Sequence, residues 1–360
     1  MDMTLRWYGS KNDSVTLKQI RQIPGVTGVI SALHDIPAGE PWPYEEVMKL
    51  KNEVEAAGLQ LAGVESINIH EDIKLGAPTR EKLIENYITS LESVGKAGVK
   101  LVCYNFMPVF DWTRTDLAMP LADGSTVLAY DGKVIEGMDP DAMFEKIEKE
   151  SGGFVMPGWE PNRKEEIKDL FRKYKGMTHE QLLENYGYFI GKIMPTCEKY
   201  GIKMAVHPDD PAWDIFGLPR IVNSEESMLK VAALHPSKLH GFTLCTGSLG
   251  SSRANDLVKI IRNPKIAERI HFAHVRNVKF ESDDEFHESA HLSSEGSFDM
   301  YEIVKALQEV GFDGVIRPDH GRMIWDEQAR PGYGLYDRAL GAVYIEGLWE
   351  AIKKSKKQEC

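Results

Sequence analysis

Short apolar runs recur along the chain, and segments with a helical or turn-rich pattern separate them. Such runs, bounded by Gly, Pro and polar residues, are typical of buried strands, and their alternation with helices indicates a parallel sheet built from βαβ units. The apolar runs predict barrel or sheet strands at residues 5–9, 25–31, 59–64, 99–104, 203–208, 241–245, 270–275 and 314–317.

Between these strands, apolar residues recur near the 3.6-residue period of an α-helix. The clearest case is 44–57, which is followed by Gly58, a residue suited to the left-handed turn that ends many helices. The same pattern predicts further helices at 16–22, 80–97, 164–174, 178–200, 224–234, 254–262 and 300–310.

The alternation is interrupted between residues 109 and 161. Two Asp-Gly pairs, Asp123-Gly124 and Asp131-Gly132, flank the run 125–130 and predict a hairpin. Inserted segments of this length are more often functional lids than spacers. We therefore predict an α/β protein with one (β/α)8 TIM barrel over residues 1–360 and a hairpin-containing, lid-like insertion at 109–161 after strand four.

An open doubly wound sheet is the alternative fold. It is disfavoured because no predicted strand is followed by Gly-x-Gly-x-x-Gly, and the chain has no Gly-x-x-x-x-Gly-Lys-Ser/Thr motif. The regular spacing of eight strands instead fits a closed barrel.

Composition and charge exclude several classes of protein. The formal charge of −12 opposes binding to nucleic acid or to an anionic membrane, since both need a basic face. No run approaches the roughly 20 apolar residues of a membrane span, and the first residues lack the pattern of a secretion signal. We expect a cytoplasmic protein without a disulfide framework, because its four cysteines are few and scattered.

Metal-ligating side chains occur at or just after the ends of the last four predicted strands. They are His207, Cys245, His274 and Asp319. A barrel of this kind gathers its active site at the carboxyl ends of its strands. Taken singly, each is explained as well by a core histidine, a small buried thiol or a helix cap. Together, two imidazoles, a thiolate and a carboxylate predict a divalent transition-metal site.

Two residues near the predicted ligands are candidates for proton transfer. His320 directly follows Asp319, and a nearby metal would lower the pKa of its imidazole. Tyr333 lies between two glycines and is either a proton donor or a loop tip. Arg276 and Arg317 are candidates to bind a carboxylate, although either could pair with an acidic side chain. Arg317 lies one layer deeper than Asp319 and is expected to brace it.

The chain after strand four carries candidate substrate-binding residues. Asn105, Trp112 and Arg114 lie in an aromatic and amide-rich stretch. Rings can cover the C–H face of a polyhydroxylated molecule while an amide bonds a hydroxyl. Core packing at the root of the insertion is the alternative for the aromatic residues.

Five separated motifs contain these residues. They are VKLVCYNFMPVFDW at 99–112, HPDDP at 207–211, CTGS at 245–248, HVRN at 274–277 and RPDHG at 317–321. Together they resemble the mannonate dehydratases of the bacterial hexuronate pathway, from Met3 to about Ala351. The resemblance implies a barrel related to xylose isomerase. It also implies a divalent metal, usually Mn²⁺, and loss of water from D-mannonate to give 2-keto-3-deoxy-D-gluconate.

The chemistry of this dehydration fits the candidate residues. A metal stabilises the enediolate that forms at C2, and an acid protonates the leaving C3 hydroxyl. We assign His207, Cys245, His274 and Asp319 to the metal and the acid/base pair to His320 and Tyr333. Asn105, Trp112, Arg114 and Arg276 are assigned to the substrate. Ligand softness alone would suit Zn²⁺ or Fe²⁺, so Fe²⁺, Co²⁺ and Zn²⁺ remain alternatives to Mn²⁺.

Other functions use parts of the same pattern. A sugar isomerase or epimerase on this barrel would use similar metal chemistry without losing water. A metal-dependent endonuclease is opposed by the negative charge, and a sugar-acid binding protein is disfavoured by the metal-type ligands. We expect a small sugar acid as the partner and a homo-oligomer, such as a dimer, as the assembly.

Overall fold

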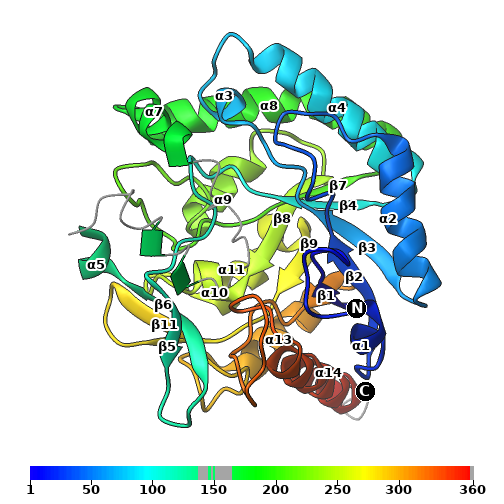
Figure 1. The fold of residues 1–360 in the computed structure, drawn as a ribbon, viewed down its shortest axis with the longest axis vertical. Coiled ribbons are helices and arrows are strands. Elements are labelled where there is room, and N and C mark those ends of the chain that lie inside the picture. The colour runs from blue at the N-terminus through cyan, green and yellow to red at the C-terminus, as the bar shows by residue number, and fades with distance from the viewer. Residues whose placement is uncertain (137–144, 147–148, 151–163, 357–360) are drawn as a thin grey trace.

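Eight parallel strands close into a barrel in a computed structural model, which describes residues 1–136, 145–146, 149–150 and 164–356. Around the barrel the strand order is β1-β12-β9-β8-β7-β4-β3-β2 (Figure 1). These strands are β1 (Asp2–Arg6), β2 (Val26–Ser31), β3 (Gln60–Glu65), β4 (Leu101–Tyr104), β7 (Lys203–Val206), β8 (His240–Cys245), β9 (Ile270–His274) and β12 (Val315–Arg317). The predicted (β/α)8 TIM barrel is confirmed.

Every predicted barrel strand overlaps an observed one, and the differences lie at the ends. β1 begins three residues earlier than predicted, although Trp7 still donates its backbone N–H to Ile30 O at 2.9 Å. His207 follows the last residue of β7, and Asp319 lies just beyond β12. Both residues therefore stand at the mouth of the barrel, where the strands give way to loops.

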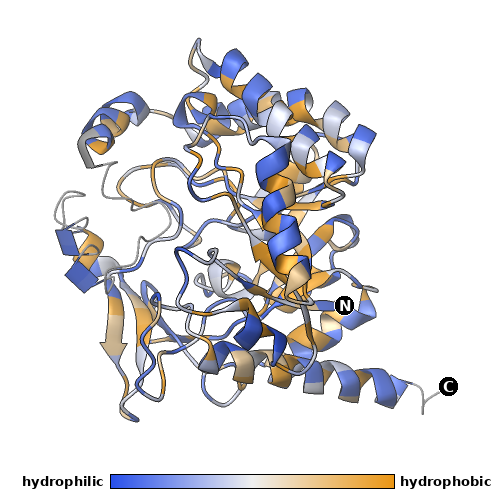
Figure 2. Ribbon diagram, turned by 45° about the vertical axis from the view of Figure 1, so that its right-hand side comes forward, coloured by the Kyte–Doolittle hydropathy of each residue, from blue (hydrophilic) through white to orange (hydrophobic). Residues whose placement is uncertain are grey.

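Helices surround the barrel and turn their apolar faces toward it (Figures 1 and 2). The helices on the barrel are α1 (Leu17–Arg21), α2 (Tyr44–Ala56), α3 (Glu71–Lys74), α4 (Arg80–Lys96), α8 (His179–Tyr200), α9 (Glu225–Ala232), α10 (Thr246–Leu249), α11 (Leu257–Arg262), α12 (Pro264–Ala267), α13 (Met300–Glu309) and α14 (Tyr336–Lys356). Helix α7 (Lys164–Tyr174) instead packs in a second apolar cluster with residues of the insertion. The sequence predicted no helix at α14. Leu340 and Val343 are exposed there, so apolar residues are not confined to one face of the helix.

Helix ends follow the sequence signals closely. Gly58 and Gly98 take positive φ values of 75° and 80° after α2 and α4, a conformation that costs glycine little. α8 begins with a capping box, in which Thr178 and Gln181 satisfy each other's backbone N–H groups. These caps set where α2 and α4 end and where α8 begins.

The interior of the barrel is filled by side chains. Ile30, Leu101, Cys103, Ala205 and Phe272 form a buried cluster inside the sheet, and a larger apolar core lies between the strands and the helices. Packed barrels of this type have no pore. Space for a ligand is therefore confined to the mouth.

A second sheet of four antiparallel strands lies outside the barrel, in the order β10-β11-β6-β5. β5 (Asp116–Pro120) and β6 (Thr126–Asp131) form the predicted hairpin through the turn that contains Gly124. The second Asp-Gly pair differs from the prediction, because Gly132 begins the helix α5 (Gly132–Glu136) and donates its N–H to Asp284 O at 2.9 Å.

The remaining strands of this accessory sheet come from after β9. β10 (Val278–Phe280) and β11 (Glu285–Glu288) were not predicted, since they are short and rich in charged residues. β6 and β11 lie beside each other at one side of the barrel (Figure 1). The Gly-Gly and Pro-Gly pairs expected to close the insertion lie outside the described residues.

Among the helices of the described ranges, none is both long enough and apolar enough to cross a membrane. Cys103, Cys197 and Cys245 are buried free thiols, and Cys360 lies outside the described residues.

Candidate metal centre and active site

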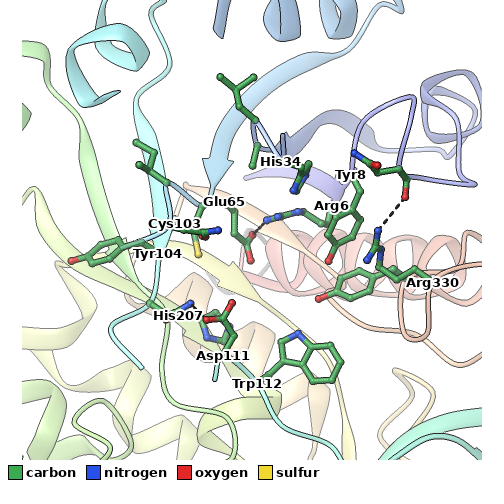
Figure 3. A pocket seen from close by; sticks show the side chains of 18 of the residues that line it. Arg6, Tyr8, His34, Glu65, Cys103, Tyr104, Asp111, Trp112, His207 and Arg330 are labelled. Carbon is green, nitrogen blue, oxygen red and sulfur yellow. Dashed lines mark hydrogen bonds and ion pairs between the residues drawn. The ribbon is translucent and has the colours of Figure 1, made fainter. Parts of the chain in front are cut away.

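A cavity of about 660 Å³ opens at the carboxyl ends of the barrel strands. Figure 3 shows Arg6 beside Glu65 on one wall, and Trp112 and Asp111 on another. Four arginines line the cavity, namely Arg6, Arg276, Arg317 and Arg330. Several of these arginines are paired with carboxylates of the same cavity, such as Arg6 and Arg317 with Glu65.

Three of the four predicted metal ligands lie within reach of a single ion. One ligand atom from each of His207, Cys245 and His274 lies within 4.8 Å of the others. β8 and β9 are neighbours, and their register pairs Cys245 with His274. His207 Nδ1 lies 2.7 Å from Pro208 O. Because a carbonyl oxygen only accepts, Nδ1 carries the proton and Nε2 keeps the lone pair that a metal needs.

His274 is fully buried, and the nearest carboxylate oxygen to its Nε2 is Glu65 Oε2 at 3.8 Å. Its Nε2 is buried and has no hydrogen-bond partner among the described residues. Burial, and then the positive charge of Arg317, lower the pKa of His274 well below its ordinary value. The ring is therefore neutral at physiological pH, and a neutral imidazole is the form that binds a metal ion.

Cys245 has hydrogen-bond donors on one side of its sulfur and the Asp319 carboxylate, at 3.6 Å, on another. Its Sγ accepts from Ser248 N at 3.4 Å and from Ser248 Oγ at 3.0 Å, and Arg276 Nη2 lies at 3.8 Å. Burial nevertheless raises the pKa of Cys245 to about 12 against the effect of Arg276. The thiol keeps its proton at neutral pH, so a divalent cation would have to displace that proton on binding.

Asp319 lies beside these three residues. It is not part of the group whose ligand atoms all lie within 4.8 Å of one another. Its Oδ2 lies 3.6 Å from Cys245 Sγ, and its Oδ1 lies 3.5 Å from His274 Nδ1. Its φ of 61° is unusual for a non-glycine residue. Arg317 Nη2 donates to its Oδ1 at 2.7 Å, which agrees with the expected bracing role.

The carboxylate of Asp319 is held in its ionised form. Burial alone would raise its pKa, but His320, His274 and the two neighbouring arginines outweigh burial and keep the pKa well below its ordinary value. The ionised carboxylate lies 3.6 Å from Cys245 Sγ and 3.5 Å from His274 Nδ1, so it borders the cluster on the Nδ1 side of that ring.

A second group with metal-ligand chemistry consists of Glu65, Cys103 and His274. The sequence analysis gave Glu65 no role, although a carboxylate at the end of β3 obeys the same strand-end rule as the other candidates. Glu65 Oε2 pairs with Arg317 Nη1 at 2.9 Å and with Arg6 Nη1 at 3.2 Å. These two arginines already neutralise its charge.

The two proton-transfer candidates are in direct contact. His320 Nε2 lies 2.9 Å from Tyr333 Oη, and both side chains line the cavity. The ring of Trp112 lies edge-on to His320, with centroids 5.7 Å apart. Tyr333 is 4% exposed, so it faces inward rather than forming a loop tip. The preceding Gly332 has a φ of 78°, and a Cβ there would lie 2.7 Å from Leu128 Cδ1.

The protonation states of this pair are opposite. Burial, and then Arg276, lower the pKa of His320 below its ordinary value, so its ring is neutral and able to accept a proton. Burial, and then Tyr8 and Asp319, raise the pKa of Tyr333 well above 10, so its phenol keeps its proton. The pair therefore combines one acceptor and one donor.

Glu288 contacts the candidate site but was not among the residues predicted from the sequence. Its Oε1 lies 3.0 Å from His320 Nδ1, and Arg276 Nη1 lies 2.8 Å from the same nitrogen. Burial alone would raise the pKa of Glu288, but Arg276 and His320 hold it at about 2. No signal marked this residue in the sequence, because it ends the unpredicted strand β11.

The four predicted substrate-binding residues have different positions. Asn105, Trp112 and Arg276 line the cavity, whereas Arg114 is fully buried and is not among its lining residues. Asn105 Nδ2 donates to Asp111 Oδ1 at 2.8 Å. Arg114 bonds both Asp210 and Glu288. Their roles in substrate binding stay predictions.

Comparison with known proteins gives concordant results. Residues 1–359 match the family described as D-mannonate dehydratase (UxuA). Mannonate dehydratase of Brachyspira hyodysenteriae is 59% identical over 357 residues, which cover 99% of this chain and 100% of that protein. Mannonate dehydratase of Thermotoga maritima is 55% identical over 360 residues, covering all of both chains.

Solved structures give the same fold. The crystal structure of mannonate dehydratase from Streptococcus suis serotype 2 superimposes with a TM-score of 0.90 and 46% identity, covering 99% of this chain and 96% of that one. A xylose isomerase domain protein from Planctomyces limnophilus superimposes with a TM-score of 0.55 at 10% identity, covering 99% of each chain. The second likeness concerns the barrel alone.

Proposed function

Because this chain belongs to the D-mannonate dehydratase family, we propose that it is a hydro-lyase that converts D-mannonate into 2-keto-3-deoxy-D-gluconate and water. The observation that carries this proposal is the contact of 2.9 Å between His320 Nε2 and Tyr333 Oη. This pair lines the same cavity as His207 and Asp319, next to the candidate metal centre.

We place a divalent metal ion on His207, Cys245 and His274, with Asp319 as the fourth ligand. The ligand atoms of His207, Cys245 and His274, all within 4.8 Å of one another, and the available Nε2 of His207 support this placement. When bound, the ion would supply positive charge beside the carboxylate and the adjacent hydroxyl of the substrate. Mn²⁺ is the proposed metal on the basis of the family resemblance, and Fe²⁺, Co²⁺ and Zn²⁺ are the alternatives.

We assign proton removal to His320 and proton donation to Tyr333. Neutral His320 takes the proton from C2 at its Nε2, and a C2–C3 double bond forms as the C3–O bond breaks. Tyr333 gives its phenolic proton to the departing hydroxyl, which leaves as water. The resulting enol rearranges to the 2-keto acid. The 2.9 Å contact then allows the proton on His320 to return to the Tyr333 oxygen, which resets both groups.

The cavity wall provides the groups for holding the substrate. We propose that the ring of Trp112 covers a C–H face of the sugar acid and that Asn105 bonds a hydroxyl. Arg276 adds positive charge near the substrate carboxylate. The cytoplasmic location and the dimeric assembly stay predictions, to be checked by cell fractionation and by light scattering.

Metal reconstitution tests the proposed function. Protein stripped with a chelator is incubated with D-mannonate and with Mn²⁺, Fe²⁺, Co²⁺ or Zn²⁺ in turn, and the 2-keto-3-deoxy acid is assayed. We expect no product without metal and turnover with at least one ion, Mn²⁺ being the most effective. Absence of product with every ion would refute the proposal. A product that retains all the oxygen atoms of the substrate would instead favour an isomerase or epimerase.

A further inference from the structure

Four buried charged side chains form a closed ring of ion pairs behind the proposed metal centre. Arg114 Nη1 lies 2.7 Å from Asp210 Oδ1, and Asp210 Oδ2 lies 2.7 Å from Arg276 Nη2. Arg276 Nη1 pairs with Glu288 Oε1, which lies 2.9 Å from Arg114 Nη2. Each side chain is at most 2% exposed. The two positive and two negative charges balance within the ring.

The ring joins parts of the chain that are distant in sequence. Asp210 follows β7 and Arg276 follows β9, so both come from loops of the barrel. Glu288 ends β11 of the accessory sheet, and Arg114 lies just before β5 of the same sheet. The ion pairs of the ring therefore connect the accessory sheet to the loops at the barrel mouth.

Three groups assigned to catalysis or metal binding contact this ring. Arg276 Nε lies 2.9 Å from Asp319 Oδ2, and Glu288 Oε1 lies 3.0 Å from His320 Nδ1. Ser248 Oγ lies 3.0 Å from Asp210 Oδ2 and 3.0 Å from Cys245 Sγ, so it links the ring to the thiol. The proposed reaction depends on the orientation of Asp319, His320 and Cys245.

A gain in stability does not explain such a ring. Buried ion pairs lose most of their mutual attraction to the cost of removing charges from water, and apolar residues of similar volume are often as good or better. Apolar residues, however, could not orient a carboxylate and an imidazole by hydrogen bonds. Groups that orient metal ligands and catalytic side chains in this way strongly affect metal affinity and turnover.

We propose that Arg114, Asp210, Arg276 and Glu288 form a positioning ring that holds His320 and Asp319 in their working orientations. The proposal rests on the roles assigned to these two residues under the proposed function. It gives the accessory sheet a part in catalysis without contact with substrate, since Arg114 and Glu288 are not among the lining residues of the cavity. Any effect of these two residues on turnover must therefore act through other groups.

The decisive variant is Glu288→Gln, which removes one negative charge and keeps the size of the side chain. We expect kcat to fall about 10- to 100-fold, by a larger factor than KM rises, because Glu288 contacts His320 directly and reaches the substrate only through Arg276. Mn²⁺ alone, titrated calorimetrically into metal-free protein, should bind about tenfold more weakly, since Arg276 would no longer hold Asp319 in place.

Glu71→Gln is the matched control. Glu71 is also buried, at 8% exposed, and it bonds Lys74 Nζ at 2.8 Å and Tyr174 Oη at 2.6 Å, away from the cavity lining. Both variants lose one buried carboxylate charge, so both should lower the melting temperature. Only Glu288→Gln should lower kcat and weaken Mn²⁺ binding.

Arg114 provides a second, independent test. Arg114→Lys keeps the positive charge but cannot bond two carboxylates through a planar fork, whereas Arg114→Met removes the charge. We expect kcat to fall in the order wild type, Lys variant, Met variant. If Glu288→Gln fails to fold, as judged by circular dichroism, the Arg114→Lys result decides.

The wild-type protein is assayed in parallel with D-mannonate. If it forms no product, the proposed function is wrong. If it is active but Glu288→Gln and Arg114→Lys retain kcat and Mn²⁺ affinity as Glu71→Gln does, the ring has only a structural role and this proposal is overturned.

Discussion

The two halves of the barrel mouth place similar residues in different chemical surroundings. Cys103 in β4 and Cys245 in β8 are both buried thiols in barrel strands, and each accepts a hydrogen bond from a hydroxyl group. Cys245 has a backbone N–H and a guanidinium nearby as well. Burial, and then the neighbouring Glu65, raise the pKa of Cys103 well above its ordinary value.

The two thiols differ in the groups around the sulfur, and this difference supports the proposal that Cys245 is the metal ligand. Residue type, strand position and burial are nearly the same, so none of them separates the two thiols. The donors around Cys245 come from the loop that follows β8 and from Arg276 after β9. We therefore propose the cation site in the half of the mouth formed by β7, β8, β9 and β12. Cys103 lines the cavity and packs in the interior cluster, but its neighbour Glu65 is already paired with Arg6 and Arg317.

Replacing each cysteine by alanine tests this comparison most strongly. Cys245→Ala should weaken Mn²⁺ binding by more than about 100-fold, because even changes to groups behind a ligand cost 10- to 100-fold. Product formation should fall to background. Cys103→Ala should keep kcat within about threefold and lose mainly packing. Calorimetric titration with Mn²⁺ and the product assay measure both effects. Equal losses in the two variants would show that the surroundings do not distinguish the thiols.

The proposed proton-transfer pair is the next test, because its assigned role is beside the metal and not as a metal ligand. With metal present, His320→Ala and Tyr333→Phe should each lower kcat by about 10²- to 10⁴-fold. Tyr186→Phe is the matched control, since this buried phenol bonds Tyr104 Oη at 2.7 Å and is not among the residues that line the cavity. Turnover near the wild-type level in both site variants, with metal bound, would contradict the assigned pair.

A pH profile sharpens the assignment of the acceptor. Folding lowers the pKa of His320 from 6.5, mainly through burial and then through Arg276, so the neutral form persists below pH 6.5. We expect kcat/KM to stay level as the pH falls through 6.5, and then to drop about tenfold per pH unit once His320 becomes protonated. The acid limb should vanish in His320→Ala. A limb centred above pH 6.5 would indicate that another group takes the proton.

Much of the fold was predictable because local patterns and the barrel agree. Periodic apolar residues and the glycines after α2 and α4 located most of the longer helices, though not α14, and apolar runs located the barrel strands. The accessory sheet was only half predicted. The Asp-Gly turn marked β5 and β6, but β11 owes its structure to pairing with β6, and β10 to pairing with β11, rather than to their own residues.

The candidate site was likewise predicted only in part. His207, Cys245 and His274 could be found because strand ends converge in a barrel, and this rule places them together. Arg114 was expected to contact substrate because it follows an aromatic cluster. Its burial between Asp210 and Glu288 depends on a partner strand that the sequence did not reveal.

The positioning ring also bears on the order of folding. Arg114 is separated by 96 residues from Asp210 and by 174 residues from Glu288, and β1 pairs with β12 across almost the whole chain. Contacts of such high sequence separation form late, because the entropy of closing long loops opposes them until other structure is in place. While the chain is still being synthesised, the proposed metal ligands and the charged residues of the ring therefore lie apart. The complete site can form only after the last third of the chain has been made.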